Sequence, residues 1–273
     1  MSTSTYAETA SPAPAADPKP RRPNGWLIVG AILTALALTA GVLTVAGWLG
    51  YRTETVRLTY QTRATDISIE LDTADVIIRP GEPGVVAVTR RISWSFNRPN
   101  LTEEWNGGTL RITGGCGARI WTGLPCDVVY TVAVPPDGSV TARVTTGDIT
   151  VSDVRNVVQL TTSTGDIRVT GASGELVLQT SSGDIVASAL TSPMVDASTR
   201  AGDIQLSLAG PPVSVYARAN AGDIDIVVPR GETYRVVADA GLGDTTVTVW
   251  QDDASNRSIG ARTSAGDIDV RYG

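Results

Sequence analysis

The sequence predicts an all-β protein, a parallel β-solenoid of about eight or nine coils of 18–23 residues preceded by one transmembrane helix. Three observations lead to this fold class. A Gly-Asp step recurs along the second half of the chain, and apolar residues alternate with polar ones on both sides of it. In addition, 24 residues near the N-terminus, Trp26 to Leu49, contain no charged side chain.

The Gly-Asp step occurs seven times, at spacings of 18, 18, 19, 20, 21 and 23 residues. Internal repeats of this length are typical of solenoids. Glycine suits a sharp corner that needs a positive φ, and aspartate can accept hydrogen bonds from nearby backbone amides. The seven steps are Gly147-Asp148, Gly165-Asp166, Gly183-Asp184, Gly202-Asp203, Gly222-Asp223, Gly243-Asp244 and Gly266-Asp267.

Apolar residues keep period two around each step, which predicts a strand, a corner and a second strand with one buried face each. The position seven before each glycine is always aliphatic, and the position two after it is isoleucine in every repeat except at Thr245. The same template fits upstream around Ala74-Asp75, and in a degenerate form around Gly108 with Leu110 and Ile112 after the corner. The solenoid is therefore expected to begin near residue 66.

All variation in repeat length falls between the second strand of one repeat and the first strand of the next. Insertions are therefore expected at one edge of the stack, while the Gly-Asp edge stays constant. We expect binding specificity to reside in these lengthening loops or in the segment before Val140.

The predicted domain organisation has four parts. Residues 1–25 form a polar Ser/Ala/Pro tail that lies in the cytoplasm, and residues 26–49 form the transmembrane helix. Residues 50–65 form a juxtamembrane linker, and residues 66–273 form an extracytoplasmic adhesin-like domain with an irregular segment at 79–139. At 1.5 Å per residue the helix would be roughly 36 Å long, enough to cross the hydrocarbon core. A cleaved signal peptide is the alternative reading of this segment.

The orientation depends on two weak signals that agree. Basic residues flank both ends of the apolar run, and the tighter cluster at Lys19, Arg21 and Arg22 favours a cytoplasmic N-terminus in the cell membrane. The only two cysteines, Cys116 and Cys126, are expected to form a disulfide in an exported domain. Two reduced thiols are the alternative.

Stacked in parallel, the corner aspartates would form a column of like charges roughly 4.8 Å apart. Calcium could compensate for their repulsion, although the sequence lacks the Gly-Gly-x-Gly-x-Asp pattern of calcium-binding solenoids. Structural turn residues are therefore the favoured interpretation, with calcium as the alternative and no other cofactor or metal expected.

Four aromatic residues lie in the irregular segment, near the cysteine pair. They could form an exposed binding surface for glycan, lipid or protein. Alternatively, they cap the open end of the solenoid, because an exposed sheet edge must be covered. These residues are Trp94, Phe96, Trp105 and Trp121.

Composition argues against two classes of function. The formal net charge of −6 disfavours nucleic-acid binding. The absence of histidine removes the commonest general base and metal ligand. Because no single coil carries a distinctive acid/base constellation, we do not expect an enzyme.

The repeats VTTGDITVSDV, TSTGDIRVTG, TSSGDIVAS and TSAGDIDV, and the block CDVVYTVAVPPDGSVTARVTTGDI that leads into them, resemble the family of proposed bacterial adhesins, β-strand-repeat proteins of the cell envelope. The resemblance covers roughly residues 60–273. It implies binding at the cell surface and supplies no catalytic residues. Some members of the family are associated with envelope-stress responses.

The sequence therefore predicts a membrane-anchored binding module without catalytic activity. It would contact the bilayer through residues 26–49 and an envelope component or membrane protein through its β-domain. A component of an envelope-stress signalling complex is the alternative, and a glycan-active β-helix enzyme is a third. Deleting residues 1–20 should disable a signalling partner and leave an adhesin working.

Overall fold

The computed structural model describes residues 25–49, 51–61, 66–95, 98–116 and 126–273. The chain divides into two compact units, residues 1–46 and 47–273. The first contains most of the helix α1 (Gly25–Leu49), which begins within one residue of the predicted position. Side chains of α1 are described at residues 25, 26 and 28–42, and among the described residues no helix is long and apolar enough to cross a membrane.

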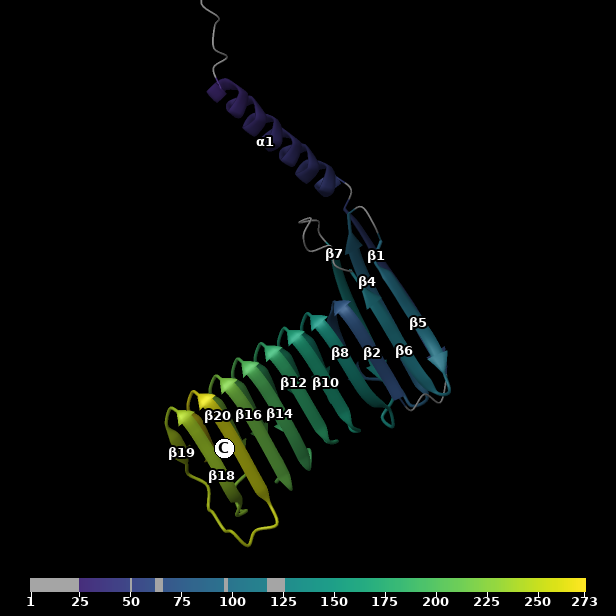
Figure 1. Ribbon diagram of the computed structural model, residues 1–273. Coiled ribbons are helices and arrows are strands. Elements are labelled where there is room, and N and C mark those ends of the chain that lie inside the picture. The colour runs from purple at the N-terminus through teal and green to yellow at the C-terminus, as the bar shows by residue number, and fades with distance from the viewer. Residues whose placement is uncertain (1–24, 50, 62–65, 96–97, 117–125) are drawn as a thin grey trace, which may run out of the picture. The chain divides into compact units, whose positions relative to one another are not determined.

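The second unit consists of two sheets that carry the repeat (Figure 1). Sheet B contains the strands before the corners, and their inward side chains are buried in an alternating pattern that follows the period-two sequence. Its strands are β2 (Asp66–Thr73), β5 (Asn100–Asn106), β6 (Thr109–Gly115), β8 (Ser139–Thr146), β10 (Val158–Thr164), β12 (Leu176–Ser182), β14 (Met194–Ala201), β16 (Ser214–Ala221), β18 (Arg235–Leu242) and β20 (Ser258–Ala265).

Sheet A contains the strands after the corners. The isoleucines two positions after each glycine lie side by side in it, as in the pairing of Ile167 with Ile149 and Ile185. Its strands are β1 (Arg52–Gln61), β3 (Asp75–Pro80), β4 (Val85–Trp94), β7 (Cys126–Val134), β9 (Ile149–Ser152), β11 (Ile167–Thr170), β13 (Ile185–Leu190), β15 (Ile204–Leu208), β17 (Ile224–Val228), β19 (Thr245–Val247) and β21 (Ile268–Tyr272).

The repeat strands pair in parallel within each sheet, and the two sheets enclose one hydrophobic core. The prediction of an all-β fold with long parallel sheets is confirmed. Each coil contributes one strand to each sheet, so the predicted strand, corner, strand unit is the building block of the fold.

The two ends of the stack do not follow chain order. At the C-terminal end, the strand orders β16-β20-β18 and β17-β21-β19 place the last coil between the two that precede it. The coil of β18 and β19, which carries Thr245 in place of isoleucine, is therefore outermost. An outermost coil has a neighbouring coil on one side only. This arrangement therefore places the more apolar coil between two others, where Ile268 is buried.

At the N-terminal end, β6 and β7 stack outside β2 and β3. In this coil the sequence template around Gly108 is wrong. Leu110 and Ile112 pair with Ile67 and Ile69, so they lie before the corner and not after it. The template is offset in this coil because the connection between β6 and β7 is longer in sequence than a Gly-Asp corner.

Antiparallel strands then extend both sheets beyond this coil, β4 and β1 in sheet A and β5 in sheet B. The described part of the segment 79–139 is thus largely regular, and it contains β4, β5, β6 and β7. The stretch 50–65, expected as a linker, holds β1 at residues 52–61. In β1 the apolar residues Val56, Leu58 and Tyr60 alternate with polar ones, a period-two strand signal that the prediction of a linker overlooked.

Candidate functional site

The corner glycines have a backbone conformation that no other residue adopts easily. Their φ angles lie between 138° and 148°. A Cβ atom at any of them would lie 2.0–2.2 Å from the carbonyl oxygen of the residue stacked beneath, another corner glycine or Ala74. Close stacking of successive corners therefore requires glycine.

The corner aspartates form a ladder of hydrogen bonds along the same edge. In each coil, one carboxylate oxygen accepts the backbone N–H of the aspartate in the next coil at 2.8–3.0 Å, from Asp75 through Asp148 onward. Threonines three residues before a glycine donate their hydroxyls to the glycine carbonyl of the neighbouring coil, as Thr180 does to Gly165 at 3.1 Å.

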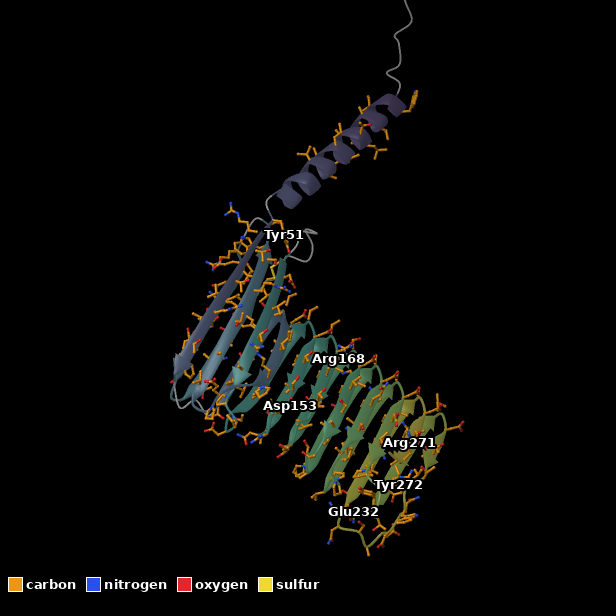
Figure 2. The ribbon with its side chains drawn as sticks, turned by 180° about the vertical axis from the view of Figure 1, so that it is seen from behind. Tyr51, Asp153, Arg168, Glu232, Arg271 and Tyr272 are labelled. Atoms are coloured by element: carbon orange, nitrogen blue, oxygen red, sulfur yellow. A yellow bond between two sulfur atoms is a disulfide. The ribbon has the colours of Figure 1, made fainter. Side chains whose placement is uncertain are left out.

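These contacts give the aspartates a structural role. Arg168 also lies on this edge, between Asp166 at 2.8 Å and Asp148 at 3.5 Å, and partly offsets the like charges (Figure 2). Among the residues that the structure describes, no group of three or more acidic or cysteine side chains could hold a metal ion. Calcium binding by the ladder stays an untested alternative.

The predicted disulfide between Cys116 and Cys126 is confirmed, with a Cα–Cα distance of 6.0 Å. It joins the end of β6 to the start of β7, the two strands of the outermost parallel coil at the N-terminal end. The bond therefore joins two strands whose connection is longer in sequence than the Gly-Asp corners. This placement indicates a bracing role.

Two of the four aromatic candidates lie in the described residues, and they are part of the N-terminal end strands. Trp94 packs partly buried against the core, with the Arg98 guanidinium 5.8 Å above its ring. Trp105 stacks edge-on against Tyr60 of β1 at 5.2 Å and is 36% exposed. Phe96 and Trp121 lie outside the described residues.

A buried charged cluster closes this end of the two sheets. Glu103 of β5 is 6% exposed and accepts hydrogen bonds from Arg90 of β4 at 2.9 Å and from the hydroxyls of Tyr60 and Tyr130 at 3.1 and 3.4 Å. Burial and the nearby Glu103 carboxylate raise the pKa of both tyrosines. The cluster ties the edge of sheet B to sheet A, so its role is structural.

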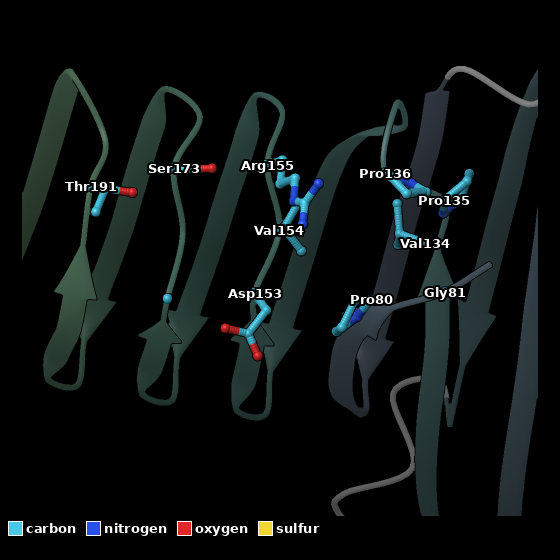
Figure 3. Close-up of a pocket in the computed structure, with 11 residues that line it drawn as sticks. Pro80, Gly81, Val134, Pro135, Pro136, Asp153, Val154, Arg155, Ser173 and Thr191 are labelled. Atoms are coloured by element: carbon cyan, nitrogen blue, oxygen red, sulfur yellow. The ribbon is translucent and has the colours of Figure 1, made fainter. Parts of the chain in front are cut away.

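A different site lies on the edge with variable loops. A cavity of about 420 Å³ opens where the strands of sheet A end and the chain returns to sheet B (Figure 3). Figure 2 shows Asp153, one of its lining residues, at the edge of the stack opposite to Arg168. Its lining residues follow five successive strands of sheet A and are Pro80, Gly81, Val134, Pro135, Pro136, Asp153, Val154, Arg155, Gly171, Ser173 and Thr191.

The polar groups of this cavity are available to a ligand. Asp153 and Arg155 are both exposed, and among the described residues neither side chain has a hydrogen-bond or ion-pair partner, although the backbone N–H of Asp153 donates to the Thr170 carbonyl at 2.8 Å. Ser173 and Thr191 add two hydroxyls, while the prolines and Val134 supply apolar walls. A polyhydroxylated or zwitterionic ligand could form hydrogen bonds and ion pairs with these polar groups and pack against the apolar walls.

Backbone strain marks the same place. Asp153 has a φ of 51°, which is uncommon for a residue other than glycine. It stacks on Gly171, whose φ is 69° and where a Cβ would lie 2.2 Å from the Asp153 carboxylate oxygen. Gly171 therefore makes room for the carboxylate. The sequence carries a signal for this: Asp153 lies 18 residues before Gly171, so an aspartate holds a glycine position in the repeat.

A known protein family matches the part of the chain that contains the regular coils. Residues 137–271 match the family described as Toastrack DUF4097, and this range begins before β8 and ends within β21. These residues are a Toastrack domain. The cavity borders it, with Asp153, Arg155, Gly171, Ser173 and Thr191 inside the Toastrack domain and the prolines partly before it.

Solved structures similar to the chain are described as proposed adhesins or binding proteins. A proposed cell adhesion protein from Clostridium sporogenes is 10% identical, with 81% of this chain and all of that chain covered, at a TM-score of 0.38. A proposed adhesin from Bacteroides fragilis is also 10% identical, with 80% and 97% covered, at a TM-score of 0.47. A proposed lipid-binding protein from Parabacteroides distasonis is 11% identical, with 81% and 97% covered, at 0.36.

Among curated proteins, none matches the chain. The resemblance to the adhesin-like family is thus confirmed at the level of the Toastrack domain.

Proposed function

We propose that this chain is a membrane-anchored binding module without catalytic activity, whose Toastrack domain holds an envelope component in the edge cavity. The observation that carries the proposal is that the side chains of Asp153 and Arg155 line the cavity without partners among the described residues. Asp153 adopts a strained backbone conformation there, and Gly171 leaves room for its carboxylate. Strain of this kind is stored at binding sites when the surrounding structure fixes it.

The anchor is the second part of the proposal. The uncharged run at residues 26–49 of the sequence supports this part of the proposal, because a segment of that length without charges suits the hydrocarbon core of a bilayer. The Cys116–Cys126 disulfide supports a Toastrack domain on the oxidising side of the membrane. In this arrangement residues 1–25 are cytoplasmic and the cavity faces the cell envelope.

The ligand chemistry follows from the lining groups. A carboxylate can accept hydrogen bonds from sugar hydroxyls, an arginine can pair with a carboxylate or phosphate, and proline rings can pack against a sugar face. We therefore infer an envelope glycan that carries acidic groups as the ligand class.

Binding of the full-length chain, held in nanodiscs, to purified cell-wall glycan fragments tests this function. The double variant Asp153→Asn, Arg155→Gln should weaken binding at least tenfold, since it removes both charges and leaves polar side chains in place. Asp196→Asn, Arg200→Gln is the matched control, because these two residues are exposed on β14 away from the cavity. Equal affinity of the two double variants would rule out the cavity, and no binding by the unchanged chain would rule out the ligand class.

A further inference from the structure

The C-terminal end of the stack differs from the N-terminal end in how its sheet edges are treated. At the N-terminal end, the Glu103 cluster and the ring pair of Tyr60 and Trp105 tie the outermost strands of the two sheets together. At the other end, β18 and β19 are the last strands of sheets B and A, and no described strand pairs with their outer sides.

This C-terminal edge also exposes large apolar side chains. Val237, Leu242 and Trp250 are 62%, 76% and 67% exposed. In the central coils, the column of outward positions that contains Val237 holds Val177, Asp196, Tyr216 and Gly260. β18 has neither lysine nor proline, the residues that most often protect a sheet edge from pairing.

The backbone of β18 presents hydrogen-bonding groups to this open side. The N–H of Arg235 bonds to the carbonyl of Arg257 in the neighbouring coil at 2.9 Å. Because backbone groups alternate sides along a strand, those of Val236, Ala238 and Ala240 point away from β20. They form a short row of donors and acceptors that a further strand can satisfy.

The side chains of β18 specify which strand fits. When β18 is laid antiparallel against a copy of itself with Val237 on the two-fold axis, Arg235 of each copy lies opposite Asp239 of the other, on the same outward face. Val236 and Ala238 then form the hydrogen-bonded pairs, which agrees with the direction of their backbone groups. A register centred on Ala238 would instead place Arg235 opposite Gly241 and lose both charge pairs.

We propose that two copies of this chain associate head to head through β18, so that sheet B continues across a two-fold axis at Val237. The contact is isologous and closed, because each copy offers the same edge once. It covers the exposed Val237 against its symmetry mate and places both charge pairs at its rim. The surface lies far along the stack from the edge cavity, so dimerisation does not depend on the proposed ligand.

Disulfide trapping of the full-length chain in detergent tests the contact. Both native cysteines are already joined, so Val237→Cys adds the only free thiol. Residues that face each other across the axis of an antiparallel pair come within disulfide range. Under mild oxidation Val237→Cys should therefore give a covalent dimer on a non-reducing gel. The matched control is Val177→Cys, in the same outward column of a central strand, which should stay monomeric.

The register is tested by charge exchange in the Val237→Cys background. Arg235→Asp should lower the crosslinked fraction at least fivefold, because it places two acids opposite each other. Adding Asp239→Arg together with Arg262→Asp, the partner of Asp239 at 3.3 Å in β20, restores the pairs with reversed sign and should recover crosslinking. Absence of the Val237→Cys dimer, or equal trapping of Val177→Cys, would overturn the interface. An unaltered yield with Arg235→Asp would overturn the register, and circular dichroism of each variant checks that the fold is kept.

Discussion

At each corner of the solenoid, the glycine and the aspartate have separate physical roles. The glycine adopts a positive φ and has no Cβ. A Cβ there would lie 2.0–2.2 Å from the carbonyl oxygen of the neighbouring corner, so its absence lets successive corners stack. The aspartate supplies a carboxylate oxygen that accepts the next coil's N–H. Both roles are local and repeated, so the seven corners from Gly147 to Gly266 all carry the same two residues. This is why the pair is visible in the sequence.

Gly183→Ala should destabilise the protein by about 3 kcal/mol or more, since it adds both backbone strain and a clash with the Gly165 carbonyl. The control is Gly84→Ala, where φ is also positive at 73° but no atom lies within 4 Å of the added Cβ. That variant should lose only about 1 kcal/mol from the left-handed backbone. Urea unfolding followed by circular dichroism measures both, and equal losses would contradict the stacking argument.

At the scale of single elements, the N-terminal strands show how an insertion at a corner changes the sequence pattern. In the coil of β6 and β7, Leu110 and Ile112 take the positions before the corner, while Tyr130 and Val132 pair with Val76 and Ile78 after it. No Gly-Asp ladder bond joins the described part of this corner. The Cys116–Cys126 disulfide holds its two strands instead.

Replacing both cysteines by serine should cost about 3 kcal/mol, the entropy of opening a loop of roughly ten residues. Thermal unfolding of the unchanged chain with and without reductant should show the same loss. The serine variant should respond to reductant by no more than experimental error. A stability loss on reduction in the variant would show that the effect does not come from this bond.

At the scale of the whole molecule, the order of the coils determines which segments are terminal in space. β20 and β21 end the sequence but lie between other coils, while β18 and β19 form the outermost coil. The two longest loops of the repeat, between β17 and β18 and between β19 and β20, provide the length for this exchange. The physical gain is the burial of Ile259, Ile268 and Val270 on both sides.

Hydrogen exchange followed by mass spectrometry tests this order. Backbone amides of β20 and β21 should exchange as slowly as those of β14 to β17, because both sides of the strands are paired. A solenoid stacked in chain order would instead fray from residue 273 inward. Fast exchange in β20 and β21 together with slow exchange in β18 and β19 would contradict the observed order.

The edge cavity and the dimer surface were less accessible to prediction than the corners. The lengthening loops did indicate the edge where the cavity lies, and Asp153 in a glycine position was a signal in the repeat. The grouping of Pro80, Pro136 and Thr191 could not be predicted, since these residues are far apart in the chain and meet only when coils stack. The open edge at β18 likewise depends on which coil is outermost.

The sequence by itself determined the unit of this protein: two short strands, a glycine corner, an aspartate that bonds to the next coil, and a core of alternating aliphatic residues. These depend on steric and hydrogen-bonding rules that operate within one repeat or between identical neighbours. Only the tertiary structure decided the order of coils at both ends, the corner insertion braced by the disulfide, the cavity and the open edge. Those features depend on long-range burial and loop length, where several arrangements satisfy the same local pattern and total buried area selects among them.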